Sequence, residues 1–125
     1  MPGLRDLIYT PQAAKGEAIS KVETHTPRIE APDEVKPGEV FKVKVTVGPH
    51  PNTLEHSIRW IELYFEEEGR AFNPILVGRY ELTPVYSEPT IEVYLKVSKP
   101  GRLIALEYCN LHGLWESYKE IKVKG

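Results

Sequence analysis

Apolar and polar residues alternate with a period of two along two stretches of the chain. Residues 41–47 read FKVKVTV and residues 91–97 read IEVYLKV. Because successive side chains of a strand point to opposite faces, both stretches predict strands with one buried face. Residues 58–65 (IRWIELYF) and 103–108 (LIALEY) are more continuously apolar, which is typical of central strands. Weaker patterns predict three further strands, at residues 28–32, 75–82 and 117–123.

Short segments rich in proline, glycine and charge separate the predicted strands. Residues 36–39 (KPGE) and 99–102 (KPGR) both place glycine directly after proline, which predicts type II turns. Residues 66–70 hold three glutamates and a glycine, which predicts a solvated hairpin tip. About seven short strands without a long helix predict an all-β fold, an immunoglobulin-like antiparallel β-sandwich.

The first part of the chain lacks a clear period. We predict that residues 1–22 form an N-terminal arm, with a short helical turn near residues 12–17 or a subunit contact as its role. Residues 23–125 then form the β-sandwich domain. A total of 125 residues fits one such domain and can bury a core without disulfides.

Composition narrows the classes of partner and compartment. The net charge is −2 and no lysine- and arginine-rich block occurs, which argues against nucleic acid. No apolar stretch approaches the roughly 18 residues of a membrane span, and the N-terminal residues do not resemble a signal peptide. A single cysteine cannot form an internal disulfide, so we expect a soluble cytoplasmic protein. The charged fraction of 27% and the 11 prolines resemble the composition of thermophile proteins.

All four histidines and the only cysteine lie in polar or turn-rich segments. The segments are ETHTP with His25, GPHPNTLEH with His50 and His56, and EYCNLHG with Cys109 and His112. Imidazole and thiolate suit iron, copper or zinc, whereas calcium and magnesium prefer oxygen ligands. The donor set therefore predicts a site for a transition metal.

Local sequence indicates how these donors can meet. Cys109 and His112 would face opposite sides of a straight strand, so both reach one metal only if the chain turns after Cys109. Asn110 and Gly113 suit that turn, which would also aim the N–H groups of Leu111 and His112 at the sulfur.

The other three histidines are expected in loops. His50 lies between two prolines that stiffen the segment, and His56 ends the same segment. Pro27 disfavours helix at Thr26, so we expect His25 in an extended loop, and none of these three histidines needs to lie in the core.

The residues alone leave four interpretations open. The histidines can be incidental in a β-sandwich interaction module, because most loop histidines are solvated surface residues. A cupredoxin-like electron carrier would bind copper through two histidines and a cysteine, but it would leave two histidines over, with Met1 as the only methionine. Structural zinc would use four donors and leave one. All five donors together suit a square-pyramidal iron with an open sixth position.

Three segments taken together resemble one family. Residues 23–27 (ETHTP), 50–56 (HPNTLEH) and 109–113 (CNLHG) are similar to the superoxide reductases of the small neelaredoxin type, and the resemblance runs from about residue 15 to the C-terminus. It implies an immunoglobulin-like fold and reduction of superoxide to hydrogen peroxide at one mononuclear non-haem iron. It also implies a rubredoxin-like electron donor and a homotetramer.

The resemblance assigns a role to six side chains, and one residue usual in the family is missing from this chain. The axial ligand would be Cys109, the sixth ligand of the oxidised iron Glu23, and the equatorial ligands His25, His50, His56 and His112. The family usually carries a lysine after that glutamate to attract the anionic substrate, and this chain has Thr24 there. Lys21, two residues before Glu23, is our candidate to replace it.

Overall fold

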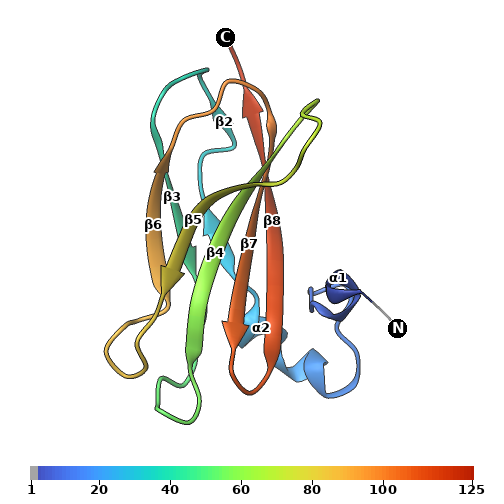
Figure 1. Ribbon diagram of the computed structural model, residues 1–125, viewed down its shortest axis with the longest axis vertical. Helices are drawn as coiled ribbons and strands as arrows, with labels where there is room; N and C mark the ends of the chain where they lie inside the picture. Colours follow the sequence, from blue (N-terminus) through green and yellow to red (C-terminus); the bar gives the residue numbers. More distant parts are fainter. Residues whose placement is uncertain (1–2) are drawn as a thin grey trace.

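The computed structural model describes residues 3–125 as two β-sheets packed face to face (Figure 1). One sheet has three strands in the order β1-β3-β6, and the other has five in the order β2-β8-β7-β4-β5. The strands are β1 (Arg28–Glu30), β2 (Glu34–Val35), β3 (Phe41–Thr46), β4 (Ile58–Glu67), β5 (Ile75–Glu81), β6 (Thr90–Leu95), β7 (Gly101–Cys109) and β8 (Gly113–Val123). The helices are α1 (Leu4–Leu7), the 3-10 helix η1 (Gly16–Lys21) and α2 (Val22–His25).

The predicted all-β sandwich is confirmed, and each of the seven expected strands is present. The eighth strand, β2, was missed because two residues are too few for a recognisable period. It pairs in parallel with β8, whereas the other strand pairs within residues 3–125 are antiparallel. None of the helices in this part of the chain is long and apolar enough to cross a bilayer.

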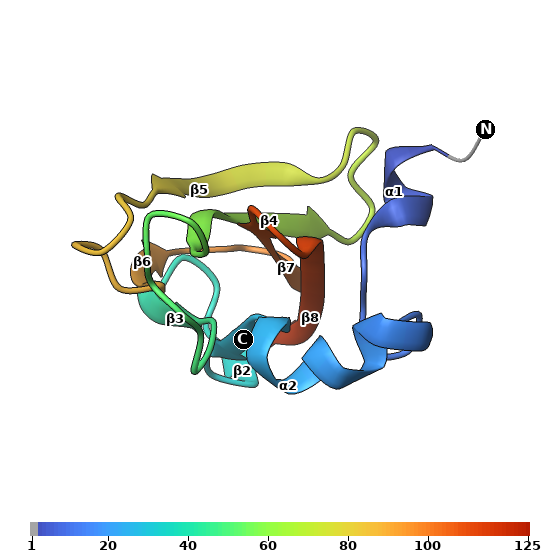
Figure 2. The ribbon, with the colours of Figure 1, turned by 90° about the horizontal axis from the view of Figure 1, so that it is seen from below.

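Alternation along the strands builds the core between the sheets. In β3, Val43 and Val45 are fully buried, while Lys42, which points to the opposite face of the strand, is exposed. They face Leu63 of β4 and Leu103 of β7, which are also fully buried. Figure 2 shows the two sheets enclosing this interior when the sandwich is viewed along its length. Apolar burial of this kind stabilises by about 25 cal/mol per Å², so the core supports the end loops.

The N-terminal segment lies against one side of the large sheet (Figure 2). The Tyr9 N–H donates to Leu114 O at 2.9 Å, and the Glu116 N–H donates to Tyr9 O at 3.0 Å. The expected helical turn near residues 12–17 is realised mainly further along, as η1. A subunit contact for this segment remains a prediction.

The two Pro-Gly segments behave differently. Gly38 has φ 75° and the Glu39 N–H donates to Lys36 O at 3.2 Å, as a type II turn requires. The second prediction was wrong, because Gly101 is outside the positive-φ region and is the first residue of β7. There it pairs with Glu67 of β4 and Ile121 of β8.

Candidate metal centre

Three segments that are distant in sequence meet at one end of the sandwich (Figure 1). They are α2, the loop between β3 and β4, and the hairpin that joins β7 to β8. Each carries part of the predicted donor set, so the fold brings the three histidine- and cysteine-containing segments together.

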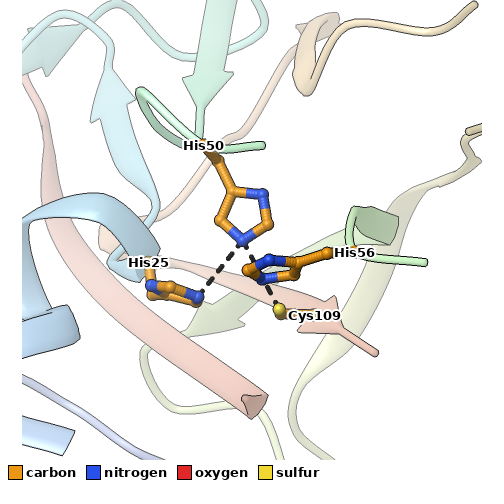
Figure 3. A group of neighbouring side chains, drawn as sticks. All are labelled: His25, His50, His56 and Cys109. Atoms are coloured by element: carbon orange, nitrogen blue, oxygen red, sulfur yellow. Dashed lines mark hydrogen bonds between the residues drawn. The ribbon is translucent and has the colours of Figure 1, made fainter. Parts of the chain in front are cut away.

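Four of the predicted donors form a compact group. His25, His50, His56 and Cys109 each offer a donor atom, and these atoms lie within 4.8 Å of one another (Figure 3). His50 Nε2 is 3.2 Å from His25 Nε2 and 3.4 Å from Cys109 Sγ. The side chains point toward one another from three segments, as ligands of a single ion do.

The fifth donor, His112, closes the group on its other side. Its Nδ1 is 3.2 Å from His25 Nε2 and 3.7 Å from Cys109 Sγ. The four imidazoles form a closed square in the order His25, His50, His56, His112, with neighbouring ring centroids 4.6 to 5.0 Å apart and each pair edge-on. All five soft donors are therefore neighbours in space.

The hairpin after β7 has the predicted turn. β7 ends at Cys109 and β8 begins at Gly113, which pairs with Cys109 and has φ 84°, a region that favours glycine. The peptide N–H groups of Leu111 and His112 are directed at the Cys109 sulfur. This three-residue loop lets Cys109 and His112 approach the same point.

The prediction of an extended loop at His25 was wrong. His25 is the last residue of α2, and it is buried with 2% of its surface exposed. Thr26 is extended, with ψ 122°, as the following proline requires. The restriction imposed by Pro27 therefore acts on Thr26, and His25 remains the last helical residue.

Hydrogen bonds select the ring nitrogen that two of the histidines present. His25 Nδ1 lies 3.1 Å from Lys21 O and 2.8 Å from the Thr24 hydroxyl, and His50 Nδ1 lies 2.6 Å from Pro51 O. A carbonyl accepts only from a protonated nitrogen, so each ring keeps its hydrogen on Nδ1. The Nε2 lone pair then points into the cluster, which is the usual arrangement of a metal-binding histidine.

Burial keeps these imidazoles in the neutral form that binds metal. Burial, followed by the neighbouring His50, lowers the pKa of His25 to about 4. Burial also lowers the pKa of His50 and of His56. It raises the pKa of the Cys109 thiol, although the two N–H groups on the sulfur act in the opposite direction. A cation at the cluster would favour the thiolate.

These residues fit a bound transition metal. His56 Nε2 is buried and has no hydrogen-bond partner among the described residues. A buried nitrogen without a partner is unfavourable, and a bound metal would provide one. Two ligands at right angles, each about 2.1 Å from one ion, lie about 3 Å apart, close to the nitrogen separations seen here. A copper site with two histidines would leave two of the four clustered imidazoles unused.

The two remaining predicted residues lie beside the cluster. Glu23 is exposed in the first turn of α2 and is not in the group of close donor atoms. Lys21 is half-buried, and its charge contributes to the lowered pKa of His56. Lys21 also lines a surface hollow together with Lys15 and His112. The geometry places Lys21 near the centre and leaves Glu23 at the surface.

Two buried residues near the donors were not identified from the sequence. The Trp115 indole is buried, packs 5.3 Å from the His25 ring and donates from Nε1 to His112 O at 3.0 Å. Glu107 is fully buried on β7 with neither carboxyl oxygen bonded to a described residue, and burial raises its pKa to about 9. Its inward position could have been predicted, since residues two apart in a strand share a face and Glu107 lies two residues before Cys109.

Similarity to known proteins agrees with this geometry. The family model described as Desulfoferrodoxin matches residues 17–118. The chain is 51% identical to a superoxide reductase from Pyrococcus horikoshii, over 82% of this chain and 90% of that one. It is 43% identical to neelaredoxin from Megalodesulfovibrio gigas, over 83% and 91% of the two chains. A solved structure of superoxide reductase (neelaredoxin) from Ignicoccus hospitalis is 61% identical, with TM-score 0.92 and coverage of 98% and 100%. The chain belongs to the desulfoferrodoxin family.

Proposed function

We propose that the protein is a superoxide reductase that uses one mononuclear non-haem iron. Superoxide takes up one electron and two protons and leaves as hydrogen peroxide. The observation that carries the proposal is the square of four imidazoles with a buried thiol beside it. The names of relatives that cover most of the chain support the same activity.

The proposed ligand set follows from the cluster. The iron would be held by the thiolate of Cys109 and by the imidazoles of His25, His50, His56 and His112. Glu23, exposed on the helix that carries His25, is proposed as a sixth ligand of the oxidised site. Iron in this site supplies the electron, and its positive charge, offset by one thiolate, attracts the anionic substrate.

The protein residues have separate tasks in this reaction. The Leu111 and His112 N–H groups favour the anionic form of the Cys109 sulfur. The Lys21 and Thr24 oxygens hold His25 in the orientation that presents Nε2. The Lys21 ammonium adds positive potential near His56, at the opening through which a small anion arrives.

Partners and compartment are part of the proposal. We place a rubredoxin-like electron donor against the metal-bearing end, where Leu54 and Leu111 are exposed and offer apolar contact. A homotetramer is proposed from the family resemblance. The cytoplasm is proposed because the single cysteine is free and buried, which requires no oxidising compartment.

Metal analysis and product stoichiometry test the proposed function. Purified protein should contain about one iron per chain and, when oxidised, show a visible thiolate-to-iron absorption band. A reductase yields one peroxide for each superoxide consumed, whereas a dismutase yields one for every two. Copper in place of iron, or the dismutase ratio, would contradict the proposal.

The Lys21→Ala variant should react more slowly with superoxide at low ionic strength. We expect the second-order rate constant to fall by up to about tenfold, because local positive potential accelerates association. The difference should shrink in high salt, where screening acts over about 3 Å at 1 M. Stopped-flow kinetics at two salt concentrations measure both effects.

Lys36→Ala is the matched control, because it removes the same charge at the end of the sandwich that holds the C-terminus. It should leave the rate constant within about a factor of two, since separated exposed charges are largely screened. An unchanged rate and unchanged salt dependence for Lys21→Ala would remove Lys21 from the mechanism.

A further inference from the structure

His56 comes from a loop that makes its own small turn. The Thr53 N–H donates to His56 O at 2.9 Å, and the His56 N–H donates to the Thr53 hydroxyl at 3.0 Å. These bonds fix the shape of residues 53–56 but do not attach the turn to the rest of the protein. The position of His56 in the cluster therefore depends on contacts outside this turn.

The His56 imidazole also lacks the anchor that two of its neighbours have. His25 and His50 each bond a carbonyl through Nδ1. No hydrogen bond is found at either ring nitrogen of His56 within residues 3–125, and its Nε2 is buried. A metal-binding histidine usually has its second nitrogen fixed by a hydrogen bond. Here the backbone of His56 must supply the orientation instead.

Asn110 attaches the backbone on both sides of His56. Its side-chain Nδ2 donates to Glu55 O at 2.8 Å, and its Oδ1 accepts from the Ser57 N–H at 2.9 Å. Its own N–H donates to Ser57 O at 3.3 Å. Because Asn110 directly follows Cys109, these three bonds connect the residues flanking His56 to the residue next to the sulfur.

Strand pairing alone does not fix this part of the structure. The β4–β7 register shifts between Ile58 and Trp60, where the ladder approaches Cys109. Arg59 in the irregular step bonds the Ser57 hydroxyl at 2.9 Å and Leu54 O at 2.8 Å, so it ties the loop to β4. Besides the backbone bond from the Asn110 N–H to Ser57 O, the Asn110 side chain ties residues 55 and 57 to the end of β7, where the ladder is irregular.

We propose that Asn110 is a positioning residue that holds His56 in register with Cys109 and so completes the ligand set. The proposal rests on the metal site of the proposed function. Residue 110 itself contacts neither substrate nor metal in this assignment. Its effect reaches the iron through the backbone of residues 55–57, which distinguishes it from the ligands and from Lys21.

The Asn110→Ala variant removes both side-chain bonds and leaves the donors themselves in place. We expect iron binding to weaken by about 10- to 100-fold, the usual effect of losing a group that orients a ligand. The visible thiolate-to-iron band should also shift, because a displaced His56 would change the set of donors around the metal. Iron release to excess chelator and the absorption spectrum of the oxidised protein measure these changes.

Asn73→Ala is the matched control. The Asn73 side chain makes the same kind of clamp on residues 67 and 70, with one bond accepted from the Glu67 N–H and two donated to carbonyls. It lies in the β4–β5 loop at the other end of the sandwich (Figure 1). It should lower the melting temperature but leave iron release and the absorption band unchanged. Identical iron release and identical spectra for the two variants would overturn the proposal.

Asn110→Asp covers the case in which the alanine variant does not fold. It keeps an oxygen for the Ser57 N–H and loses the donor to Glu55 O, so its iron should be released faster than in the parent protein. Parent-like release and spectrum in this variant would contradict the positioning role. The parent protein is measured first: absence of iron there would refute the proposed function, whereas iron-loaded parent with parent-like variants refutes only the role of Asn110.

Discussion

The Cys109→Ser variant is expected to lose superoxide reduction and the visible absorption band while the β-sandwich remains folded. A serine hydroxyl stays protonated at neutral pH and would supply no negative charge to the metal. Loss of a residue that merely orients a ligand costs about 10- to 100-fold, so removal of the thiolate itself should lower the rate at least a hundredfold. Stopped-flow kinetics, iron content and absorption of the same sample test this expectation.

The control for this variant must place a hydroxyl on the same inner face of β7. Ala105→Ser does so, since Ala105 is fully buried four residues before Cys109 in the same strand. A buried unpaired hydroxyl costs about 1–3 kcal/mol, so both variants should be less stable. Only Cys109→Ser should lose activity. Superoxide consumption that survives this substitution would remove the thiolate from the mechanism.

The donor set could be predicted because these residue types have few other roles in this chain. The four histidines lie outside the alternating strands and Cys109 ends one of them. The Cys109–Gly113 hairpin turns where Asn110 and Gly113 suggested. The relative positions of the three segments could not be predicted, since they depend on how the two sheets pack. The same packing buries His25, for which local sequence had predicted an extended loop.

The residues around the donor set could be predicted only in part, because most of their contacts join parts of the chain that are distant in sequence. Asn110 was recognised as a turn residue, but its bonds to residues 55 and 57 span more than 50 positions in the chain. Trp115 acts through a ring contact with His25 and a bond to His112 O. Such contacts have no sequence period, whereas burial of Glu107 follows from strand alternation and was available from the pattern.

The fold was predicted correctly where buried and exposed residues alternate along a strand. The prediction was wrong at a glycine that could be required for either of two structural reasons. Alternation in residues 41–47 and 91–97 correctly predicted β3 and β6. Glycine after proline at residue 38 provides the positive φ of a type II turn. Gly101 has no positive φ, so its reason is the lack of a side chain. Sequence alone cannot separate these two uses of glycine.

Adding a side chain at Gly101 is expected to cause the second large effect, a loss of stability. A Cβ at this position would meet the Glu66 carbonyl oxygen well inside van der Waals distance and would lie 2.9 Å from Phe65 Cζ. The backbone cannot easily move away, because Gly101 is paired with both β4 and β8. We expect Gly101→Ala to lower the free energy of unfolding by about 3 kcal/mol, the upper end of ordinary overpacking costs. The midpoint of denaturant unfolding measures the change.

Gly78→Ala separates this clash from the general effect of alanine in a strand. Gly78 lies in β5 without a positive φ, and an added Cβ would be no closer than 3.4 Å to side-chain atoms of Tyr80 and Val93. Those side chains can shift slightly, so the cost should stay below about 1 kcal/mol. Gly101 lies at the end of β7 opposite Cys109, so Gly101→Ala should leave the iron spectrum unchanged. We expect the same of Gly78→Ala in β5. Equal stability losses in the two variants would show that close approach of β4 and β7 is not the reason for glycine at residue 101.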